Sequence, residues 1–469
     1  MKKFFALALL SALSAIGLGC GSSGSSQNLN SQPGNVFMTG EDAPLPSVVG
    51  FNVTLNSVML NAQDGSTATV ISSPTTVDFA RLVGLRSPLA FSSVKANTYV
   101  SATFVLANPS ITWVDMTQNP PAIGAAITAT FPGNQNPYSV TVNFPSPMVV
   151  GSNGLAGLKM EMDIRQSVAV DGNGQVTGAV NPVIYIKATK ASDPDGQITD
   201  LTAGLVSVDS ASNSFVLQGP YGRQLTVFVN NNTTFNSGYN INNLATPAIV
   251  GVQGYFQADG SLMASGVEVI TTTQSFVSGR VLQVVNNGAG QAQQVTMWIG
   301  ESGADLVADV DTVQTIDLSL VNSNSYAICF FDNGFTQLLF NNTSILVGQR
   351  IFIGGTVVSN TFTPTMVSLR LQGVYGLFNP GSVTVSNGNA GNFQLMNNAL
   401  IGYSLGGADL TVNTFNGTLF VDLSGLNQLQ ATSTQIPLIT RGLLLKDPIS
   451  GNAQFYAGLV ADPPITVTH

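Results

Sequence analysis

Apolar and polar residues alternate with period two along most of the chain after residue 36. The alternation is clearest at residues 49–56, 158–165 and 225–230. Such a pattern over roughly four to eight residues is typical of a half-buried β-strand. Asp-Gly or Asn-Gly dipeptides, for example at residues 64–65 and 287–288, separate the runs. These dipeptides tolerate positive φ and favour hairpin turns, so the pattern predicts a chain built from β-strands.

Helical periodicity is scarce, and residues 75–84 give the best example. Phe79, Leu82 and Val83 stand at positions i, i+3 and i+4, which lie on one face of a helix. Gly84 is suited to the position that follows a helix C-terminus. We therefore expect one short helix in this segment and few others.

The length of 469 residues suggests roughly three domains of about 150 residues each. A polar, turn-rich linker at residues 191–199 divides the chain, and a degenerate repeat follows it. We expect an all-β protein, with an N-terminal antiparallel β-sandwich followed by two or three small β-barrel-like domains. The expected domain ranges are 37–190 for the sandwich, then 199–272, 273–373 with an insertion, and 374–469.

The N-terminal residues have the pattern of a secretory signal peptide. Lys2 and Lys3 precede an apolar run at residues 4–17. As a helix this run would span about 21 Å, less than the roughly 30 Å of a bilayer core, so it predicts a signal peptide over residues 1–19. Residues 17–20 (Gly-Leu-Gly-Cys) resemble the lipobox of bacterial lipoproteins. The resemblance implies that Cys20 is lipidated and begins the mature chain.

A tether and a membrane anchor follow from this interpretation. Residues 20–36 contain the lipidated cysteine and a Gly/Ser/Asn-rich segment without apolar periodicity. A flexible tether of this length reaches about 20 Å. No Asp follows Cys20, and lipoproteins of this kind are usually sent to the outer membrane. The expected location is extracytoplasmic, anchored to the bacterial outer membrane on its periplasmic or surface face.

Composition excludes several function classes. The single His is His469, so the chain alone cannot form a Ser-His-Asp triad, a Cys-His dyad or a His-ligated zinc site. The formal net charge is −9, and the sequence has no basic cluster. Because nucleic-acid binding depends on neutralising phosphates, we expect no nucleic-acid partner. No cofactor is expected. Prolines scattered through the body also disfavour a lipid-spanning barrel.

Two family resemblances cover about half of the chain. Residues 39 to about 188 resemble the bacterial family named domain of unknown function 4382. The segments that carry this resemblance are residues 40–44, 51–58, 77–82 and 158–164. Residues 203–270 resemble domain of unknown function 5666, whose small β domains often occur in tandem on secreted proteins. The resemblances imply an extracytoplasmic β-rich lipoprotein and supply no catalytic residue.

Two acidic groups are candidate sites. Glu161 and Asp163 stand two apart on an expected strand, about 6.5 Å from each other, a spacing compatible with glycoside hydrolysis. Lys159 and Arg165 flank them, and a solvent-facing ladder of alternating charges is the interpretation we favour. Separate weak calcium candidates are Asp193, Asp195 and Asp200, whose spacing lacks a full calcium-loop frame. A plain interdomain turn is the alternative, and no metal is assigned.

Aromatic residues and the second cysteine complete the candidates. Six aromatic residues could stack on sugar rings, although core packing is the simpler role; they are Trp113, Trp298, Tyr99, Tyr221, Tyr239 and Tyr255. Cys329 lies in an apolar run and is expected to be a buried small hydrophobe.

The sequence as a whole predicts a non-enzymatic, lipid-anchored cell-envelope protein that binds a partner or acts as a spacer. Its membrane contact would be the N-terminal lipid, and a glycan or another envelope protein could be its partner. Two alternatives stay open. One is a carbohydrate- or polymer-binding surface module, and the other is a carboxylate-dependent glycoside hydrolase.

Overall fold

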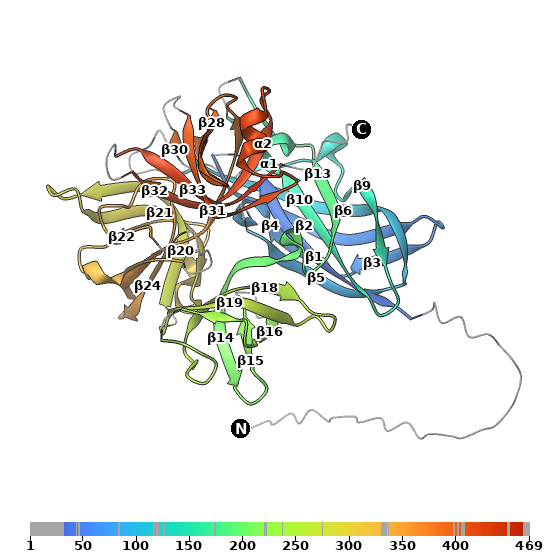
Figure 1. Ribbon diagram of the computed structural model, residues 1–469, viewed down its shortest axis with the longest axis horizontal. Helices are drawn as coiled ribbons and strands as arrows, with labels where there is room; N and C mark the ends of the chain where they lie inside the picture. Colours follow the sequence, from blue (N-terminus) through green and yellow to red (C-terminus); the bar gives the residue numbers. More distant parts are fainter. Residues whose placement is uncertain are drawn as a thin grey trace, which may run out of the picture.

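A computed structural model describes most of the chain after residue 31. The described residues are 32–462, apart from 44, 46, 83–84, 116–117, 119–121, 125–126, 173–174, 220–222, 237, 274, 330–334, 336, 397–398, 401–402, 405–408 and 448–450. The expected all-β class is confirmed: strands dominate and the few helices are short. Figure 1 shows a blue-to-cyan sandwich and three further β units, coloured green, yellow to orange, and orange to red, around a common centre.

The N-terminal unit is a sandwich of two sheets. The first sheet has the order β13 (Ile184–Thr189), β10 (Leu155–Asp163), β1 (Gly34–Ala43), β5 (Ser87–Val94). The second sheet has the path β3 (Thr67–Ile71), β2 (Val48–Ala62), β6 (Asn97–Asp115), β7 (Ala122–Ile123), with β4 (Thr75–Asp78) on β2 and with β8 (Ile127–Thr128) and β9 (Tyr138–Val150) on β6. The pair β1–β10 is parallel, unlike the wholly antiparallel sandwich expected.

Alternating residues of the two sheets form the sandwich core. Phe51, Phe104, Leu158 and Met160 are fully buried between them. Burial of such side chains provides the main driving force for this unit, at about 1.5–3 kcal/mol for each large apolar side chain. The period-two pattern therefore predicted the inward face correctly on these strands.

The expected helix is wrong for residues 75–82; Val83 and Gly84 lie outside the described residues. Residues 75–78 form β4, and a single 3₁₀ turn, η1 (Phe79–Leu82), follows. Thr75, Thr76 and Val77 are β-branched, and such residues fit a strand better than a helix. The Asp78 carboxylate then accepts hydrogen bonds from the backbone N–H groups of Phe51 and Ala80, at 2.8 and 3.1 Å, and ends the pairing with β2.

The unit after the linker is a closed five-stranded barrel. Its strands are β14 (Ile198–Asp209), β15 (Ser214–Gln218), β16 (Gln224–Phe228), β18 (Ile249–Phe256) and β19 (Leu262–Thr271). They pair in the order β16-β15-β14-β18-β19, and a parallel pairing of β16 with β19 closes the ring. Numbered along the barrel, the order is 1-2-3-5-4 with strands 3 and 5 parallel, which is the topology of the OB-fold.

The last unit repeats this topology. Its barrel strands are β26 (Gln372–Phe378), β28 (Ala390–Met396), β31 (Leu410–Val421), β32 (Pro437–Lys446) and β33 (Ala453–Ala461). β31 pairs with β33 in parallel, and β26 pairs with β28 to close the ring. Helix α2 (Leu426–Ala431) lies between the third and fourth barrel strands and buries Leu426 and Leu429.

The middle unit is an open variant of the same barrel. It has the order β22 (Val313–Asp317), β21 (Ala292–Ser302), β20 (Ser275–Asn286), β24 (Arg350–Val358), β25 (Thr361–Leu369), β23 (Tyr326–Ile328). Within the described residues, no pairing joins β22 to β25, so the ring stays open there. We call the units from residue 198 onward the first, second and third barrels.

Short elements complete the fold. They are α1 (Ile164–Ser167), β11 (Val168–Val170), β12 (Val176–Val180), β17 (Thr234–Phe235), β27 (Thr384–Asn387), β29 (Ala399–Leu400), β30 (Tyr403–Ser404), η2 (Pro132–Asn134), η3 (Pro194–Gly196), η4 (Ala304–Asp309) and η5 (Ser323–Ser325). None of the helices in the described part of the chain has the length and hydropathy that a membrane crossing requires.

Candidate functional site

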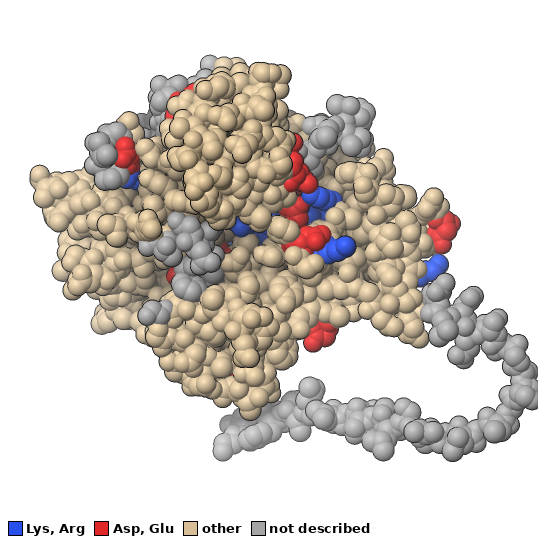
Figure 2. Space-filling view, in the orientation of Figure 1, with Lys and Arg blue, Asp and Glu red and all other residues tan. Residues whose placement is uncertain are grey.

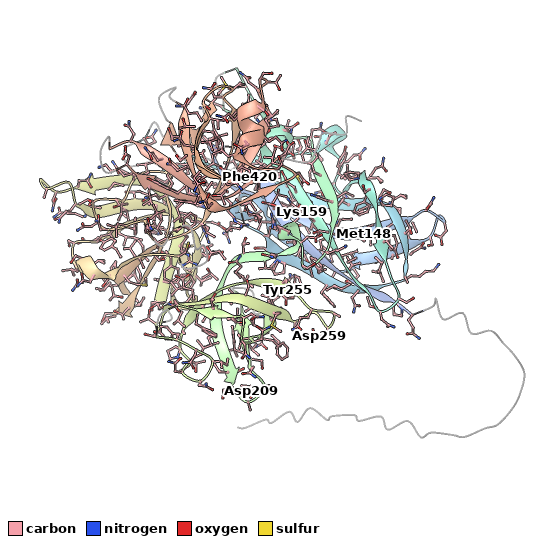
Figure 3. All side chains as sticks on the ribbon, viewed as in Figure 1. Met148, Lys159, Asp209, Tyr255, Asp259 and Phe420 are labelled. Atoms are coloured by element: carbon pink, nitrogen blue, oxygen red, sulfur yellow. The ribbon has the colours of Figure 1, made fainter. Side chains whose placement is uncertain are left out.

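Many of the few charged residues of this chain gather where the four units meet. Figure 2 shows blue and red atoms concentrated at the centre of the body, with a mostly tan surface around them. We call this group the charged junction; its buried members are Glu41, Arg86, Lys159, Glu161, Asp163, Asp195, Asp200, Glu268, Arg280, Arg350 and Arg370. In Figure 3, Lys159 lies at the centre of the body, whereas Asp209 and Asp259 lie toward the outside of the first barrel.

One half of the charged junction is built around Asp195, in the linker turn η3. The Arg86 guanidinium contacts Asp195 at 3.1 Å and Glu41 at 3.3 Å. The Lys159 ammonium contacts Glu41 at 2.9 Å and Asp195 at 3.6 Å. Burial alone would raise the pKa of both carboxyls, but these cations hold each pKa below its ordinary value. The linker is therefore bound to the sandwich in its ionised form.

The other half is built around Asp200, at the start of the first barrel. Its carboxylate contacts Arg350 at 2.8 Å and also accepts a hydrogen bond from Arg370. Arg370 in turn contacts Glu268 of the first barrel at 2.8 Å. Burial opposes ionisation of Asp200, but the two guanidinium groups keep its pKa below the ordinary value. These pairs join the first barrel to the second.

Weaker ion pairs reach the remaining interfaces. Lys187 of the sandwich contacts Asp422 of the third barrel at 2.7 Å. Arg81 of the sandwich contacts Asp311 of the second barrel at 2.5 Å. Arg165 lies over the ring of Tyr375, 4.0 Å from its centroid. Ion pairs or a cation–π contact thus connect the sandwich to the second and third barrels.

The predicted solvent-facing ladder at Glu161 and Asp163 is wrong. The two residues are only 1% and 2% exposed. Strand β10 is central in its sheet, and the face that carries Lys159 and Glu161 lies against the linker and Asp422 of the third barrel. Asp163 caps α1 by accepting the Gln166 backbone N–H at 2.9 Å. Period-two alternation identified the two faces of β10 but could not indicate that a second domain covers the polar one.

Glu161 is the least compensated acid of this face. Its Oε2 atom is buried without a hydrogen-bond partner within the described residues. Burial raises the pKa of Glu161 to about 7, while Lys159 partly opposes the shift. Asp42 on β1 adjoins Glu41, which pairs with Glu161 in the sheet; it also has a buried oxygen without a hydrogen bond, and burial raises its pKa. The junction and the adjoining end of β1 therefore contain protonatable groups beside fully paired ones.

The calcium candidates do not form a cation site. Asp195 and Asp200 are occupied by the lysine and arginine partners described above, and Asp193 accepts the Lys190 backbone N–H at 3.0 Å. In the part of the chain that the structure describes, no group of three or more His, Cys, Asp or Glu residues is placed to hold a metal ion. Asp195 and Asp200 instead bind arginines and lysines from distant parts of the chain.

The aromatic candidates divide between core and surface. Tyr99, Trp113 and Trp298 are largely enclosed: Tyr99 is 1% exposed and Trp298 is 2% exposed, and Trp113 packs against Gly124. Tyr255 on β18 is 37% exposed and stands on the outer surface of the first barrel, where Figure 3 labels it. Tyr239 is partly buried against the first barrel core. Tyr221 lies outside the described residues.

The two cysteines have different outcomes. Cys329 is 3% exposed, and burial raises the pKa of its thiol well above the ordinary value. The expectation of a buried, unreactive side chain agrees with this environment. Cys20 lies outside the described residues, so its lipidation stays a prediction.

A cavity between the sandwich and the second barrel contains a residue that the sequence analysis did not single out. Arg280 on β20 is 8% exposed and lines this cavity of about 50 Å³. Arg81, Trp298, Glu301 and Arg350 line it as well. Within the described residues, Arg280 has neither a hydrogen bond nor an ion pair. Arg280 follows Gly279 in an apolar run. A single Arg in such a run does not indicate which groups will surround it, so the sequence could not predict this cavity.

Comparisons with known proteins agree with the two family resemblances. Residues 34–177 match the family described as domain of unknown function DUF4382, and residues 195–268 match the one described as DUF5666. A search of curated proteins found no match. The solved structure titled "drosophila Unr CSD456" aligns at 8% identity over 58% of this chain and 98% of that chain, with a TM-score of 0.14, which is too low to support any inference. The DUF4382 match therefore falls on the sandwich, and the DUF5666 match that follows it falls on the first barrel.

Proposed function

We propose that this chain is a lipid-anchored, non-enzymatic binding protein of the bacterial outer membrane. The observation that supports the proposal best is the arrangement of three OB-type barrels around one ionic centre. Asp200 and Glu268 bind Arg350 and Arg370 of the second barrel, and the Asp195 cluster binds the linker to the sandwich. Barrels of this topology commonly bind oligomeric ligands. A body held by buried ion pairs presents these barrels in fixed positions.

The anchor rests on Cys20 and the apolar segment before it. One acyl chain binds a membrane only marginally, whereas the several chains of a bacterial lipoprotein hold it firmly. Radioactive palmitate should label the full chain in a Gram-negative host and should fail to label the Cys20→Ala variant. Cys329→Ala is the matched control and should be labelled like the unaltered chain. A Cys20→Ala protein that still sediments with membranes would refute the anchor.

A second candidate function is the binding of a neutral glycan. It is favoured by the composition of the barrel face formed by β15 and β16, which OB-folds use for oligonucleotides and oligosaccharides. Gln218 and Gln224 are exposed there and are hydrogen-bonded to each other at 3.1 Å, and Thr226 is exposed beside them. Uncharged amides and hydroxyls suit sugar hydroxyls, whereas the net charge of −9 opposes a polyphosphate.

A glycan array with the full chain tests this candidate. We expect binding to a neutral polysaccharide that is lost in the double variant Gln218→Ala/Gln224→Ala. The matched control is Gln293→Ala/Gln294→Ala, which removes two exposed amides from β21 of the second barrel. Absence of binding across plant, fungal and bacterial polymers would count against the glycan and leave the anchor untouched.

A further inference from the structure

The cavity beside Arg280 contains a positive charge that the protein itself does not neutralise. Its two arginine neighbours are already paired: Arg350 contacts Asp200 at 2.8 Å, and Arg81 contacts Asp78 at 3.0 Å and Asp311 at 2.5 Å. Glu301 lies 3.8 Å from Arg350. Among the described residues, no carboxylate lies within ion-pair distance of Arg280. Three cations thus line one hollow, and one of them has no partner.

This arrangement is unfavourable unless water or a solute enters the cavity and meets the Arg280 donors. A buried guanidinium presents five N–H donors, and leaving them unsatisfied carries a large desolvation penalty. Burial and the neighbouring Arg350 lower the pKa of Arg280 to about 9, so the group is still cationic at neutral pH. Ser278 adds a second polar residue to the cavity lining, and its hydroxyl has no hydrogen-bond partner within the described part of the chain.

The cavity has room for a small group and an access route. Its volume of about 50 Å³ is several times the roughly 10–15 Å³ that one water requires. Gly279 and Gly300 contribute only backbone to its lining. Trp298 and Val49 form an apolar wall, while the Glu301 side chain is 37% exposed at the rim. A solute can therefore reach Arg280 from solvent past Glu301.

We propose that this cavity is a binding site for an oxyanion, with the Arg280 guanidinium and the Ser278 hydroxyl as its donors. The planar fork of an arginine matches two oxygens of a carboxylate, phosphate or sulfate group. The three groups share this chemistry, and the group can be free or part of a larger acidic ligand. The site lies between the DUF4382 domain and the second barrel, so an occupied cavity adds a contact between these two units.

The first experiment measures anion binding to the full chain in detergent. Inorganic phosphate, sulfate and acetate are titrated separately at constant ionic strength, which is maintained with sodium chloride. Heat of binding and the thermal midpoint are both recorded. We expect at least one of the anions to give saturable binding with a Kd in the millimolar range or tighter. If none of the three saturates, the proposal is wrong. Comparison among the three shows whether planar or tetrahedral oxyanions are preferred.

Substitution of Arg280 assigns the binding to this cavity. Arg280→Gln should weaken the preferred anion at least tenfold. Arg223→Gln, the same substitution at an exposed position on the first barrel, should leave the affinity within twofold. Equal affinity in Arg280→Gln and the unaltered chain would place the anion elsewhere and overturn the proposal.

A second pair of variants keeps Arg280 in place, so that it remains informative if Arg280→Gln does not fold. A Cβ at Gly300 would lie 3.8 Å from the Ser278 carbonyl oxygen and 4.0 Å from Arg81 Nε, which is ordinary contact. Gly300→Asp introduces a tethered carboxylate, and we expect it to abolish binding of the free anion. Gly300→Asn has nearly the same shape without the charge and should retain binding. Equal binding by Gly300→Asp and Gly300→Asn would refute the assignment.

Discussion

The surroundings of Asp200 and of Arg280 show two ways in which one barrel buries arginines. On one side, Arg350 and Arg370 meet Asp200 and Glu268, which the first barrel provides. On the other side, Arg280 shares a cavity with Arg81 of the sandwich, and the acids beside that cavity, Asp78 and Asp311, already pair with Arg81. At the first interface each arginine has a carboxylate partner, and we call this interface closed. The second interface has an excess positive charge, and we call it open. A closed interface supports the fold, whereas an open one can recruit a ligand.

Removal of a cation from the closed interface should have the largest effect. Arg370→Met leaves Asp200 and Glu268 buried with fewer partners. Breaking a buried pair in this way typically costs about 3–5 kcal/mol. Urea unfolding should show this loss, and the exposed control Arg223→Met should change stability by no more than about 0.5 kcal/mol. A loss below about 1 kcal/mol for Arg370→Met would show that the closed interface does not stabilise the fold.

Glu161 provides a pH test of the same junction. Its folded-state pKa of about 7 lies above the ordinary value of 4.5, so the folded state binds the proton more tightly than the unfolded state does. Stability from this group is therefore fully present below about pH 4.5 and is lost as the pH rises to about 7. The size of the change is on the order of 3 kcal/mol.

The variant Glu161→Gln should flatten that dependence. Chemical unfolding followed from pH 4.5 to 7.5 gives the comparison, with Glu301→Gln at the cavity rim as the control that retains the slope. If the slope is the same in the unaltered chain and in Glu161→Gln, another acid, such as Asp42, is responsible for the titration.

Replacement of the unpaired Arg280 should change the free energy of unfolding in the opposite direction from Arg370→Met. Arg280→Met replaces an uncompensated buried charge with an apolar side chain of similar length. In a buffer free of oxyanions we expect stability to stay equal or to rise by about 1 kcal/mol. The measurement is the urea midpoint at low ionic strength. Destabilisation as large as that of Arg370→Met would mean that the two regions do not differ.

The smallest effect is expected at the rim of the junction. Lys187 and Asp422 are 35% and 57% exposed, and exposed pairs contribute about 0–1 kcal/mol. Lys187 also contacts Asp195 at 2.8 Å, so the cleaner variant is Asp422→Asn. Its small loss of stability should decrease further when salt is added. A loss above about 2 kcal/mol would show that the third barrel depends on this pair.

Much of the fold followed from local sequence patterns. Alternation placed Phe51, Leu158 and Met160 in the sandwich core, because successive side chains of a strand point to opposite faces. The helix expected at residues 75–84 is not formed at residues 75–82 for a local reason: three β-branched residues and the Asp78 hydrogen bonds favour a strand although the apolar spacing fits a helix.

The candidate site was much harder to predict. Asp195 and Asp200 were noted as an oxygen-rich turn, but their partners lie far away in sequence. Arg350 is 150 residues from Asp200, and Arg370 is 170 residues away. Sequence spacing cannot encode such a contact, because it depends on how whole domains pack. The sequence pattern predicted a solvent-exposed Glu161 because its strand face is polar. The third barrel covers that face, and local sequence cannot indicate this domain packing.

The sequence by itself determined the β class, the two family resemblances and the single histidine, His469, since these depend on composition, on period-two alternation and on local motifs. The tertiary structure decided which charges are buried, which of them are paired, and that Arg280 faces a cavity without a counter-charge. The physical reason is that burial and Coulomb interactions depend on distances in space, and four units had to pack together before those distances were set.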